Sequence, residues 1–426
     1  MRTRGPRSPA GFYGWHIVGF ATLMVAASAP GQTAAVSVFI DPMIAELGIS
    51  RSTVSAAYLV GTLSGAFAMP FVGRMLDRFG VRRVMTVIGL VFSAALCALA
   101  AVSSVVGLTG GFVAIRMAGQ GALGLAATTA VALWFDKRRG TALGVVSAIG
   151  ASAIALAPVL LEGVVIAQWG WRSAWLAQGV TIALVVLPVA WFGMRDRPAD
   201  LGQRPDGAPD DGSSGERHAW GLTRAAALRT PFFWVVTAAI ATVSLLVTAI
   251  NFHQISLLGE QGLSATEAAA NFIPQTVANL LATFAAGYLA DRVHNRILLV
   301  ACMACLLGGL VLATVVSPGV LAVLLGLLIG AAGGSVRALE AATLTRYFGT
   351  AHIGAIRGTV SAVMVGSTAF GPLAFAGVFE LAGSYVPALL VASAMPVTVA
   401  IAAIVIRPPH VGSRNHEGAT PEPCAE

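Results

Sequence analysis

Residues 73–83 read Gly-Arg-Met-Leu-Asp-Arg-Phe-Gly-Val-Arg-Arg and form one of the few dense groups of charges in the chain. The stretch lies between two apolar segments, each long enough to cross a bilayer. Charged residues between two such segments belong at a membrane surface, where water solvates them. The stretch is therefore expected to form a short turn that acts as a hinge between two transmembrane helices.

The composition of the whole chain indicates an integral membrane protein. Of its 426 residues, 57% are hydrophobic and 11% are charged, and the mean hydropathy is +0.81. Soluble globular domains carry about 25% charged residues, so that class is excluded. The net charge of +7 does not indicate nucleic-acid binding, because the basic residues lie in short clusters between apolar runs.

Twelve apolar runs approach or exceed the length of about 20 residues that a helix needs to cross the hydrocarbon core. The expected spans of the first half are 14–39, 52–72, 84–102, 106–134, 140–166 and 172–192. Those of the second half are 232–258, 264–289, 297–316, 319–348, 354–379 and 385–406. The sequence thus predicts an all-α membrane protein with twelve transmembrane helices in two pseudo-symmetric six-helix halves.

The basic residues orient these spans. Most of the 26 lysines and arginines lie in the termini and the even-numbered loops, whereas Arg51 and Arg172 lie in odd-numbered loops. Cytoplasmic loops retain positive charge, so both termini are expected in the cytoplasm and the chain in the inner (plasma) membrane. The expected units are an N-terminal half (1–192), a flexible cytoplasmic linker (193–230), a C-terminal half (231–406) and a cytoplasmic tail (407–426).

The two halves repeat one another at a constant offset of 214 residues. The matched pairs are Gly73 and Gly287, Asp77 and Asp291, Arg78 and Arg292, Gly140 and Gly354, Gly144 and Gly358, Ser147 and Ser361, and Pro158 and Pro372. Chance alone readily matches single glycines, but it does not readily place Gly-x-x-x-Asp-Arg twice. Duplicated halves are a transporter architecture.

The stretch 73–83 resembles the loop signature of the major facilitator superfamily, and Arg116 with Gly119-Gln120-Gly121 fits the same family. Further stretches resemble its bacterial monocarboxylate and oxalate/formate branch: Pro30-Gly31-Gln32-Thr33, residues 197–202, Tyr347-Phe348-Gly349 and Ile356-Arg357-Gly358. The resemblance implies a monomeric transporter of a small solute that works by alternating access. It also implies no enzyme activity and no cofactor, with protons or a counter-substrate as the coupled species.

One departure from that branch concerns the substrate site. In span eight the branch commonly carries an Asn and, four residues later, an Arg that meets the substrate carboxylate; here Asn279 is followed by Thr283. Arg337 in span ten is the expected substitute, near the bilayer middle. Glu340 lies three residues on, on the same helical face. The pair is either a structural ion pair or an anion site with a titratable partner.

Five further polar residues are candidates for the substrate pathway: Gln32, Thr33, Tyr58, Asn279 and Thr283. Gln32 and Thr33 follow Pro30-Gly31, where a broken helix would free backbone groups toward a cavity. Each of the five has a competing interpretation as a packing residue between helices. Arg116, Pro158 and Pro372 are interpreted as structural, and Asp41 and Glu162 are expected at a depth similar to that of Arg116.

The family resemblance implies that the charged loop contacts the opposite half when the cytoplasmic side closes. Arg357, near the start of span eleven, is the candidate partner of Asp77. The expected gating residues are Gly73, Asp77, Arg78, Gly80 and Arg82, with Asp291 and Arg292 in the equivalent loop and Arg357.

The sequence contains no phosphate-binding glycine-rich loop and no His-Glu-x-x-His pattern, so neither an ATP-driven pump nor a membrane metalloprotease is supported. Its cysteines do not form a metal-binding pattern. The function expected first is secondary transport of a small organic anion or monocarboxylate. The alternatives are efflux of neutral or drug-like compounds and a non-transporting membrane sensor.

Overall fold

The computed structural model describes residues 12–136, 138–207, 221–290, 292–349 and 353–408, and within them it contains helices but no β-strand. The helices of the first half are α1 (Gly14–Ala27), α2 (Thr33–Leu47), α3 (Arg51–Phe79), α4 (Val81–Ala100), α5 (Val105–Ile115), α6 (Gly124–Trp134), α7 (Arg139–Leu160) and α8 (Ala167–Pro188). Short 3-10 or π segments continue them: η1 (Ala29–Gly31), η2 (Arg116–Leu123), η3 (Leu161–Ile166) and η4 (Val189–Gly193).

The second half is built in the same way. Its helices are α10 (Pro231–Glu260), α11 (Ala265–Ala270), α12 (Phe272–Ala290), α13 (Asn295–Ala313), α14 (Val320–Phe348), α15 (Ile353–Ala382), α16 (Val386–Ala392) and α17 (Ala394–Val405). Between the halves lie η5 (Pro198–Leu201), η6 (Pro205–Gly207) and α9 (Arg224–Leu228).

The helices account for the twelve predicted crossings. Nine continuous stretches of the described chain are long and apolar enough to cross a membrane, and one of them, Arg139–Gly193, contains two spans because Gly170 (φ 75°) breaks it. Two further crossings, α5–η2–α6 and α11–α12, carry polar residues such as Arg116 and Asn279 within their apolar runs. The prediction of an all-α membrane protein with two six-helix halves is confirmed.

The first crossing is broken at the Pro30-Gly31 pair. α1 ends at Ala27, and Gln32 has an extended backbone (φ −87°, ψ 150°) before α2 begins. A Cβ atom on Gly31 would lie 2.5 Å from the carbonyl oxygen of Ile115. The break therefore packs directly against the start of η2, because only glycine permits so close an approach.

Glycine also brings the second and fourth crossings of each half together. In the C-terminal half the glycines lie on α14: Cβ atoms on Gly330 and Gly334 would lie 2.1 and 2.0 Å from the carbonyl oxygens of Gln275 and Asn279 on α12. In the N-terminal half a glycine lies on α3, where a Cβ on Gly61 would approach the Phe112 carbonyl oxygen to 2.8 Å. The same helix pair is thus closely packed in both halves, with the glycines on opposite members.

A second symmetrical feature ties the third crossing of each half to the sixth. The Arg82 guanidinium lies 4.7 Å from the ring centre of Trp191, at the end of the sixth crossing. Arg296, at the equivalent position after the offset of 214, donates to the carbonyl oxygens of Ala403 (2.8 Å) and Ile404 near the end of α17. A cation at these carbonyls satisfies acceptors that the helix end leaves free.

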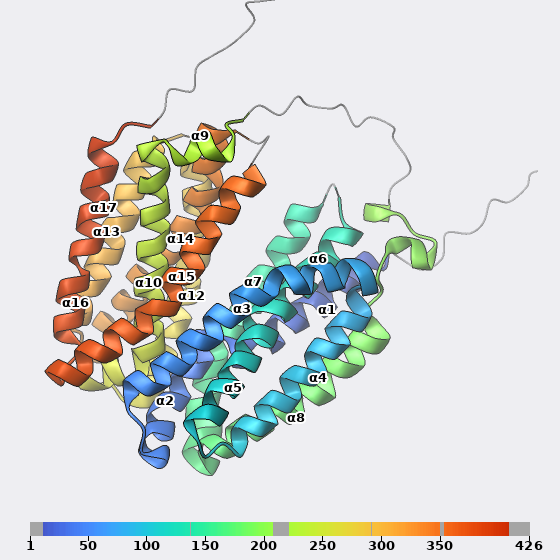
Figure 1. Ribbon diagram of the computed structural model, residues 1–426, viewed down its shortest axis with the longest axis horizontal. Coiled ribbons are helices and arrows are strands. Elements are labelled where there is room, and N and C mark those ends of the chain that lie inside the picture. Colours follow the sequence, from blue (N-terminus) through green and yellow to red (C-terminus); the bar gives the residue numbers. More distant parts are fainter. Residues whose placement is uncertain (1–11, 137, 208–220, 291, 350–352, 409–426) are drawn as a thin grey trace, which may run out of the picture.

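We call the end of the bundle where α3 ends and α9 lies the linker end, and the opposite end the far end. At the far end, Ser52 donates its backbone N–H and its hydroxyl to the Glu380 carboxylate on α15, at 2.8 and 2.9 Å. Arg51 lies over the Phe379 ring at 5.2 Å. At the linker end, Asp77 and Arg357 are exposed, and Figure 1 shows the two halves spreading apart. The halves are closed at the far end and open at the linker end.

The packing of α12 on α14 generates a stability prediction. Gly334→Ala places a Cβ against the Asn279 carbonyl oxygen, and overpacking of this kind costs about 1–3 kcal/mol. We expect the apparent Tm in detergent to fall by roughly 2–5 °C. Gly377→Ala on α15 is the matched control, because a Cβ there meets nothing within 4 Å. Equal Tm values for the two variants would contradict this account of the helix pair.

Candidate functional site

Arg337 lies well inside α14, with ten residues between it and the linker end of that helix at Phe348, or about 16 Å along the axis. Its side chain is exposed, although the residue is far from both ends of a membrane-spanning helix. Among the residues that the structure describes, its guanidinium makes no hydrogen bond and no ion pair. A charge at this depth requires water or a counter-ion, and no ion pair within the described residues supplies one.

Glu340 does not form an ion pair with Arg337, which was one of the two alternatives for these residues. Its carboxylate pairs instead with the Nε of Arg357 on α15, at 3.4 Å. The Glu340 side chain is only 12% exposed, whereas that of Arg357 is 51% exposed. Arg337 and Glu340 still interact electrostatically, but the structural ion pair links α14 to α15 and leaves Arg337 without a partner in the described chain.

Asn279 and Thr283 lie on α12 where that helix packs against α14. The Thr283 hydroxyl is 2.7 Å from the carbonyl oxygen of Asn279 and 3.2 Å from that of Gly334, three residues before Arg337. A Cβ on Gly333 would touch the Asn279 amide nitrogen at 3.0 Å. The structure therefore places these two predicted pathway residues on the same helix pair as Arg337.

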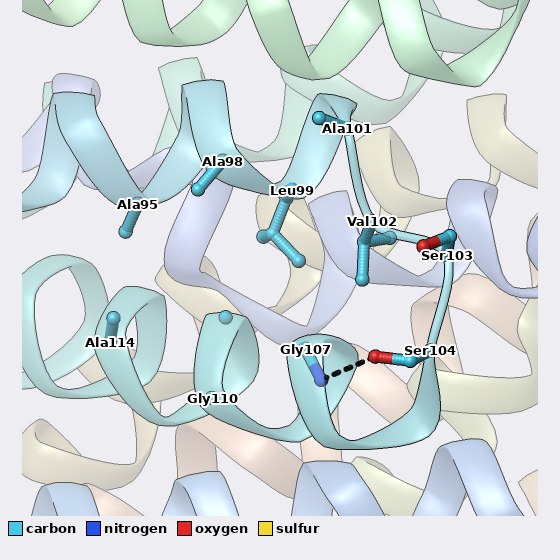
Figure 2. Close-up of a pocket in the computed structure, with 11 residues that line it drawn as sticks. Ala95, Ala98, Leu99, Ala101, Val102, Ser103, Ser104, Gly107, Gly110 and Ala114 are labelled. Atoms are coloured by element: carbon cyan, nitrogen blue, oxygen red, sulfur yellow. Dashed lines mark hydrogen bonds between the residues drawn. The ribbon is translucent and has the colours of Figure 1, made fainter.

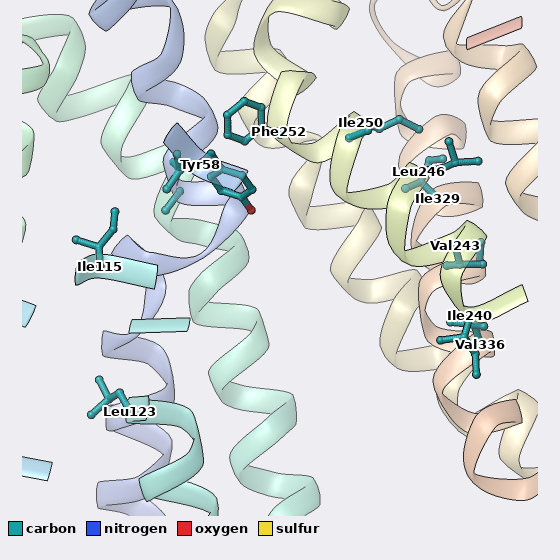
Figure 3. Close-up of a cluster of buried hydrophobic side chains, with 14 of the residues drawn as sticks. Tyr58, Ile115, Leu123, Ile240, Val243, Leu246, Ile250, Phe252, Ile329 and Val336 are labelled. Carbon is teal, nitrogen blue, oxygen red and sulfur yellow. The ribbon is translucent and has the colours of Figure 1, made fainter. Parts of the chain in front are cut away.

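The predicted residues of the first half form a separate group nearer the far end. The hydroxyls of Thr33 and Tyr58 are 2.6 Å apart, and the Tyr58 ring is 4.4 Å from the ring of Phe252 on α10, centre to centre. Figure 3 shows Tyr58 and Phe252 meeting between the two halves. Gln32 donates to the Ser28 hydroxyl within its own crossing. Tyr58 and Phe252 are fully buried, so this contact between the two halves excludes solvent.

Arg116 is buried in the N-terminal half, with 2% of its surface exposed. Its Nε donates to the Thr62 hydroxyl (3.1 Å), its Nη1 donates to the Gly31 carbonyl (3.0 Å), and its guanidinium lies 4.4 Å from the centre of the Tyr58 ring. The break at Pro30-Gly31 thus directs its free carbonyl to Arg116 rather than to a cavity. The π segment η2 that begins at Arg116 has no signature in the sequence pattern.

Other charged groups pair away from Arg116. Asp41 forms an ion pair with Arg51 at 2.6 Å, near the far end. Pro372 lies inside α15, where its carbonyl oxygen accepts from the His253 Nε2 at 2.8 Å, and Pro158 lies inside α7 just before η3. His253 is also 3.0 Å from the Tyr385 hydroxyl through its Nδ1, so both ring nitrogens are engaged.

The charged loop at the linker end is exposed, and its contacts are with residues of its own half. Gly80 (φ 80°) ends α3, and the Asp196 carboxylate lies against it and accepts the Arg82 backbone N–H at 2.8 Å. Asp77 and Arg78 are exposed, the Arg78 guanidinium lies 5.2 Å from the centre of the Phe79 ring, and a Cβ on Gly73 would meet nothing within 4 Å.

Sequence reasoning did not identify Asp196 as a partner of this loop, although it follows span six within Arg195-Asp196-Arg197. In the equivalent loop of the second half, Arg292 stacks on Tyr288 at 3.7 Å. Asp291 lies outside the described residues.

A cavity of about 370 Å³ lies elsewhere, between α4 and α5. Figure 2 shows its lining of small side chains, including Ala95, Ala98 and Ala114, and the Ser104 hydroxyl that accepts the Gly107 N–H. The lining contains no charged residue, so this cavity offers nothing to fix an ionic solute. Within the described residues, no group of three His, Cys, Asp or Glu side chains is arranged as a metal site.

This chain is similar in sequence to a known family of membrane transporters. Residues 21–273 and 249–426 match the sequence model of the Major Facilitator Superfamily. An uncharacterized MFS-type transporter, YcxA of Bacillus subtilis (strain 168), is 28% identical over 167 residues, which are 38% of this chain and 39% of YcxA. Monocarboxylate transporter 4 of Gallus gallus is 30% identical over 184 residues, 41% of this chain and 37% of that protein. The matched part spans about two fifths of each relative's length.

Two solved structures share the fold. A bacterial homolog of the human lysosomal transporter Spinster, in an inward-facing and occupied conformation, has a TM-score of 0.65 at 16% identity and covers 93% of this chain and 96% of its own. The nucleoside transporter NupG has a TM-score of 0.74 at 12% identity, with 92% of this chain and 99% of its own covered. With its twelve crossings in two alike halves and a family match along nearly its whole length, this chain belongs to the Major Facilitator Superfamily of transporters.

Proposed function

We propose that the protein is a secondary active transporter of a small organic anion, of the monocarboxylate type, and that Arg337 binds the anionic group. The observation that carries this proposal is an exposed arginine without a protein partner in the described chain, well inside a membrane-spanning helix. A guanidinium offers a planar pair of N–H donors that matches a carboxylate. The partial similarity to monocarboxylate transporter 4 supports the same solute class.

The second candidate is a transporter of neutral or drug-like compounds. Thr283 favours it, because it stands where the monocarboxylate branch carries an arginine on span eight. The small Thr283 side chain is held against the Gly334 carbonyl and adds no charge near Arg337. Arg337 on the neighbouring helix supplies the cation that Thr283 lacks, and for this reason we favour the anion.

The proposed cycle uses the two six-helix halves, 1–192 and 231–406, as the moving bodies, with the linker 193–230 on the cytoplasmic side of the inner membrane. In that orientation the structure corresponds to an inward-open state. The far end is held shut by the Ser52–Glu380 contact and by Tyr58 against Phe252. A solute entering from the linker end meets Arg337 before it reaches the closed aromatic pair.

Closure of the linker end would bring α3 against the first turns of α15. The two helices run antiparallel, and Ser52 meets Glu380 at the far end. Asp77 lies 25 residues after Ser52 on α3, so in the same register it would face the residue 25 positions before Glu380 on α15. That position is 355, two residues before Arg357. The dipole at the N-terminus of α15 also favours a carboxylate there. Asp77 and Arg357 are therefore proposed to meet in the outward-open state.

Uptake into proteoliposomes tests the function. We expect purified protein to take up at least one of radiolabelled formate, acetate, lactate, pyruvate and oxalate, with or without an imposed proton gradient. The comparison of the two conditions also identifies proton coupling. Uptake of none of these acids, together with transport of a neutral compound, would favour the second candidate.

The role of Arg337 is tested by substitution. Loss of a charge-assisted hydrogen bond costs about 1.5–3 kcal/mol, so Arg337→Gln is expected to reduce acid uptake roughly tenfold or more. Arg337→Lys should retain part of the activity, because the charge remains and the planar fork is lost. Arg224→Gln on α9 is the control, since it removes an exposed arginine from the connection between the two halves. Loss of folded protein in Arg337→Gln but not in the control would instead indicate a structural role.

The role of Asp77 is tested by its effect on the two states. If its contact forms only when the linker end is closed, Asp77→Asn removes about 1–3 kcal/mol from that state. The population then shifts toward the inward-open state, transport falls, and cysteines placed at the linker end of the pathway become more accessible to thiol reagents. Unchanged accessibility and rate would show that the loop serves topology alone.

Glu380 should act in the opposite direction. Its carboxylate caps the start of α3 in the present state, and a charged cap contributes about 0.5–2 kcal/mol. Glu380→Gln is expected to lower the accessibility of the same cysteines, and the double change with Asp77→Asn should return accessibility toward the wild-type value. An increase in accessibility in Glu380→Gln would refute the closed far end as the origin of this state.

A further inference from the structure

Glu340 has two arginines nearby: Arg337 on its own helix and Arg357 on α15. It follows Arg337 by three residues on α14, so both side chains leave the same helical face. Its carboxylate is directed to Arg357 of α15 at 3.4 Å. One carboxylate thus has two cationic partners within reach and is paired with only one of them in the open state.

We propose that Glu340 is an exchangeable counter-ion that couples closure of the linker end to the charge state of the anion site. With the linker end open, Glu340 pairs with Arg357 and Arg337 is free for the substrate. When closure brings Asp77 to Arg357, Glu340 is released and pairs with Arg337. This inference rests on the proposed role of Arg337 as the anion site.

The exchange needs little movement, because the alternatives differ mainly in side-chain rotamer. Side chains at positions i and i+3 of a helix approach each other without a change in the backbone. Glu340 is largely buried, so leaving it unpaired after Arg357 is captured would be costly. Arg337 is the nearest cation on its own helix face, and it has no competing protein partner among the described residues.

Two consequences follow for transport. In a loaded carrier, Glu340 competes with the substrate carboxylate for Arg337 and favours its release on the far side. In an empty carrier, Glu340 neutralises Arg337, so the halves can reorient without enclosing an unpaired charge. Glu340 is therefore a positioning residue for net transport, whereas exchange of substrate for substrate does not require it.

The first test reports the charge near Arg337 without any substrate. Thr283→Cys is made in a background with Cys97, Cys302, Cys305 and Cys424 replaced. The new thiol lies on α12 beside Gly334 of α14, which is about one helical turn from Arg337. Its reaction rates with the anionic sulfonatoethyl and the cationic trimethylammonioethyl methanethiosulfonate are compared as a ratio. Arg357→Gln should lower the anion-to-cation ratio, because Glu340 moves to Arg337.

A double-mutant cycle separates movement of Glu340 from the simple loss of a charge. If the charges stay in place, the effects of Arg357→Gln and Glu340→Gln on the logarithm of the ratio add. If Glu340 moves, Arg357→Gln lowers the ratio roughly fivefold more in the protein that retains Glu340 than in the Glu340→Gln variant. A factor of this size is expected for a unit charge brought close in water. Arg224→Gln should leave the ratio unchanged. Additive effects would overturn the exchange.

The second test uses radiolabelled lactate, or whichever acid of the panel the wild type takes up fastest. Glu340→Gln should lower net uptake by about tenfold, because the empty carrier must then enclose an unpaired Arg337, and should leave exchange within about twofold of wild type. An equal loss of both would overturn the role in empty-carrier return. If no acid is transported, the proposed function fails, while the thiol cycle still decides whether the counter-ion exchanges.

Discussion

A charged side chain inside a bilayer must have a partner or water, and this constraint organises the whole molecule. The two arginines within the apolar spans meet it in opposite ways. The Arg116 guanidinium contacts the Gly31 carbonyl, the Thr62 hydroxyl and the Tyr58 ring, all of which belong to the N-terminal half. Arg337 is exposed well inside α14 and has no such enclosure among the described residues. The partners of Arg116 therefore lie within one half, and Arg337 is the arginine proposed to bind the solute.

The duplicated halves share packing rules but differ in chemistry. In both, the second and fourth crossings approach each other through glycine, and an arginine of the third crossing reaches the end of the sixth. In the N-terminal half the fourth crossing carries the buried Arg116, and the equivalent position in the C-terminal half is Gly330. The symmetrical frame thus carries an arginine inside the fourth crossing at different positions in the two halves, buried at Arg116 and exposed at Arg337 on α14.

Contacts between the halves have to be weak enough to alternate. The contacts at the far end include a carboxylate cap, a cation over a ring and an aromatic pair, each worth on the order of 1 kcal/mol. Contacts of this size can be exchanged for similar ones at the linker end without a large change in the total free energy. The same balance explains why single carboxylates, such as Asp77 and Glu380, are expected to shift the populations of the two states.

The sequence by itself determined the twelve crossings, the duplication and the loop signature, because apolar length, charge clusters and a repeated motif are local properties of the chain. It also placed Arg337 at depth in span ten. Only the tertiary structure decided the partners: Glu340 pairs with Arg357 rather than Arg337, the Gly31 carbonyl is taken by Arg116, and Asp41 pairs with Arg51. Periodicity states which face of a helix a side chain leaves, but a partner on another helix depends on how helices distant in sequence are packed, and no local pattern encodes that.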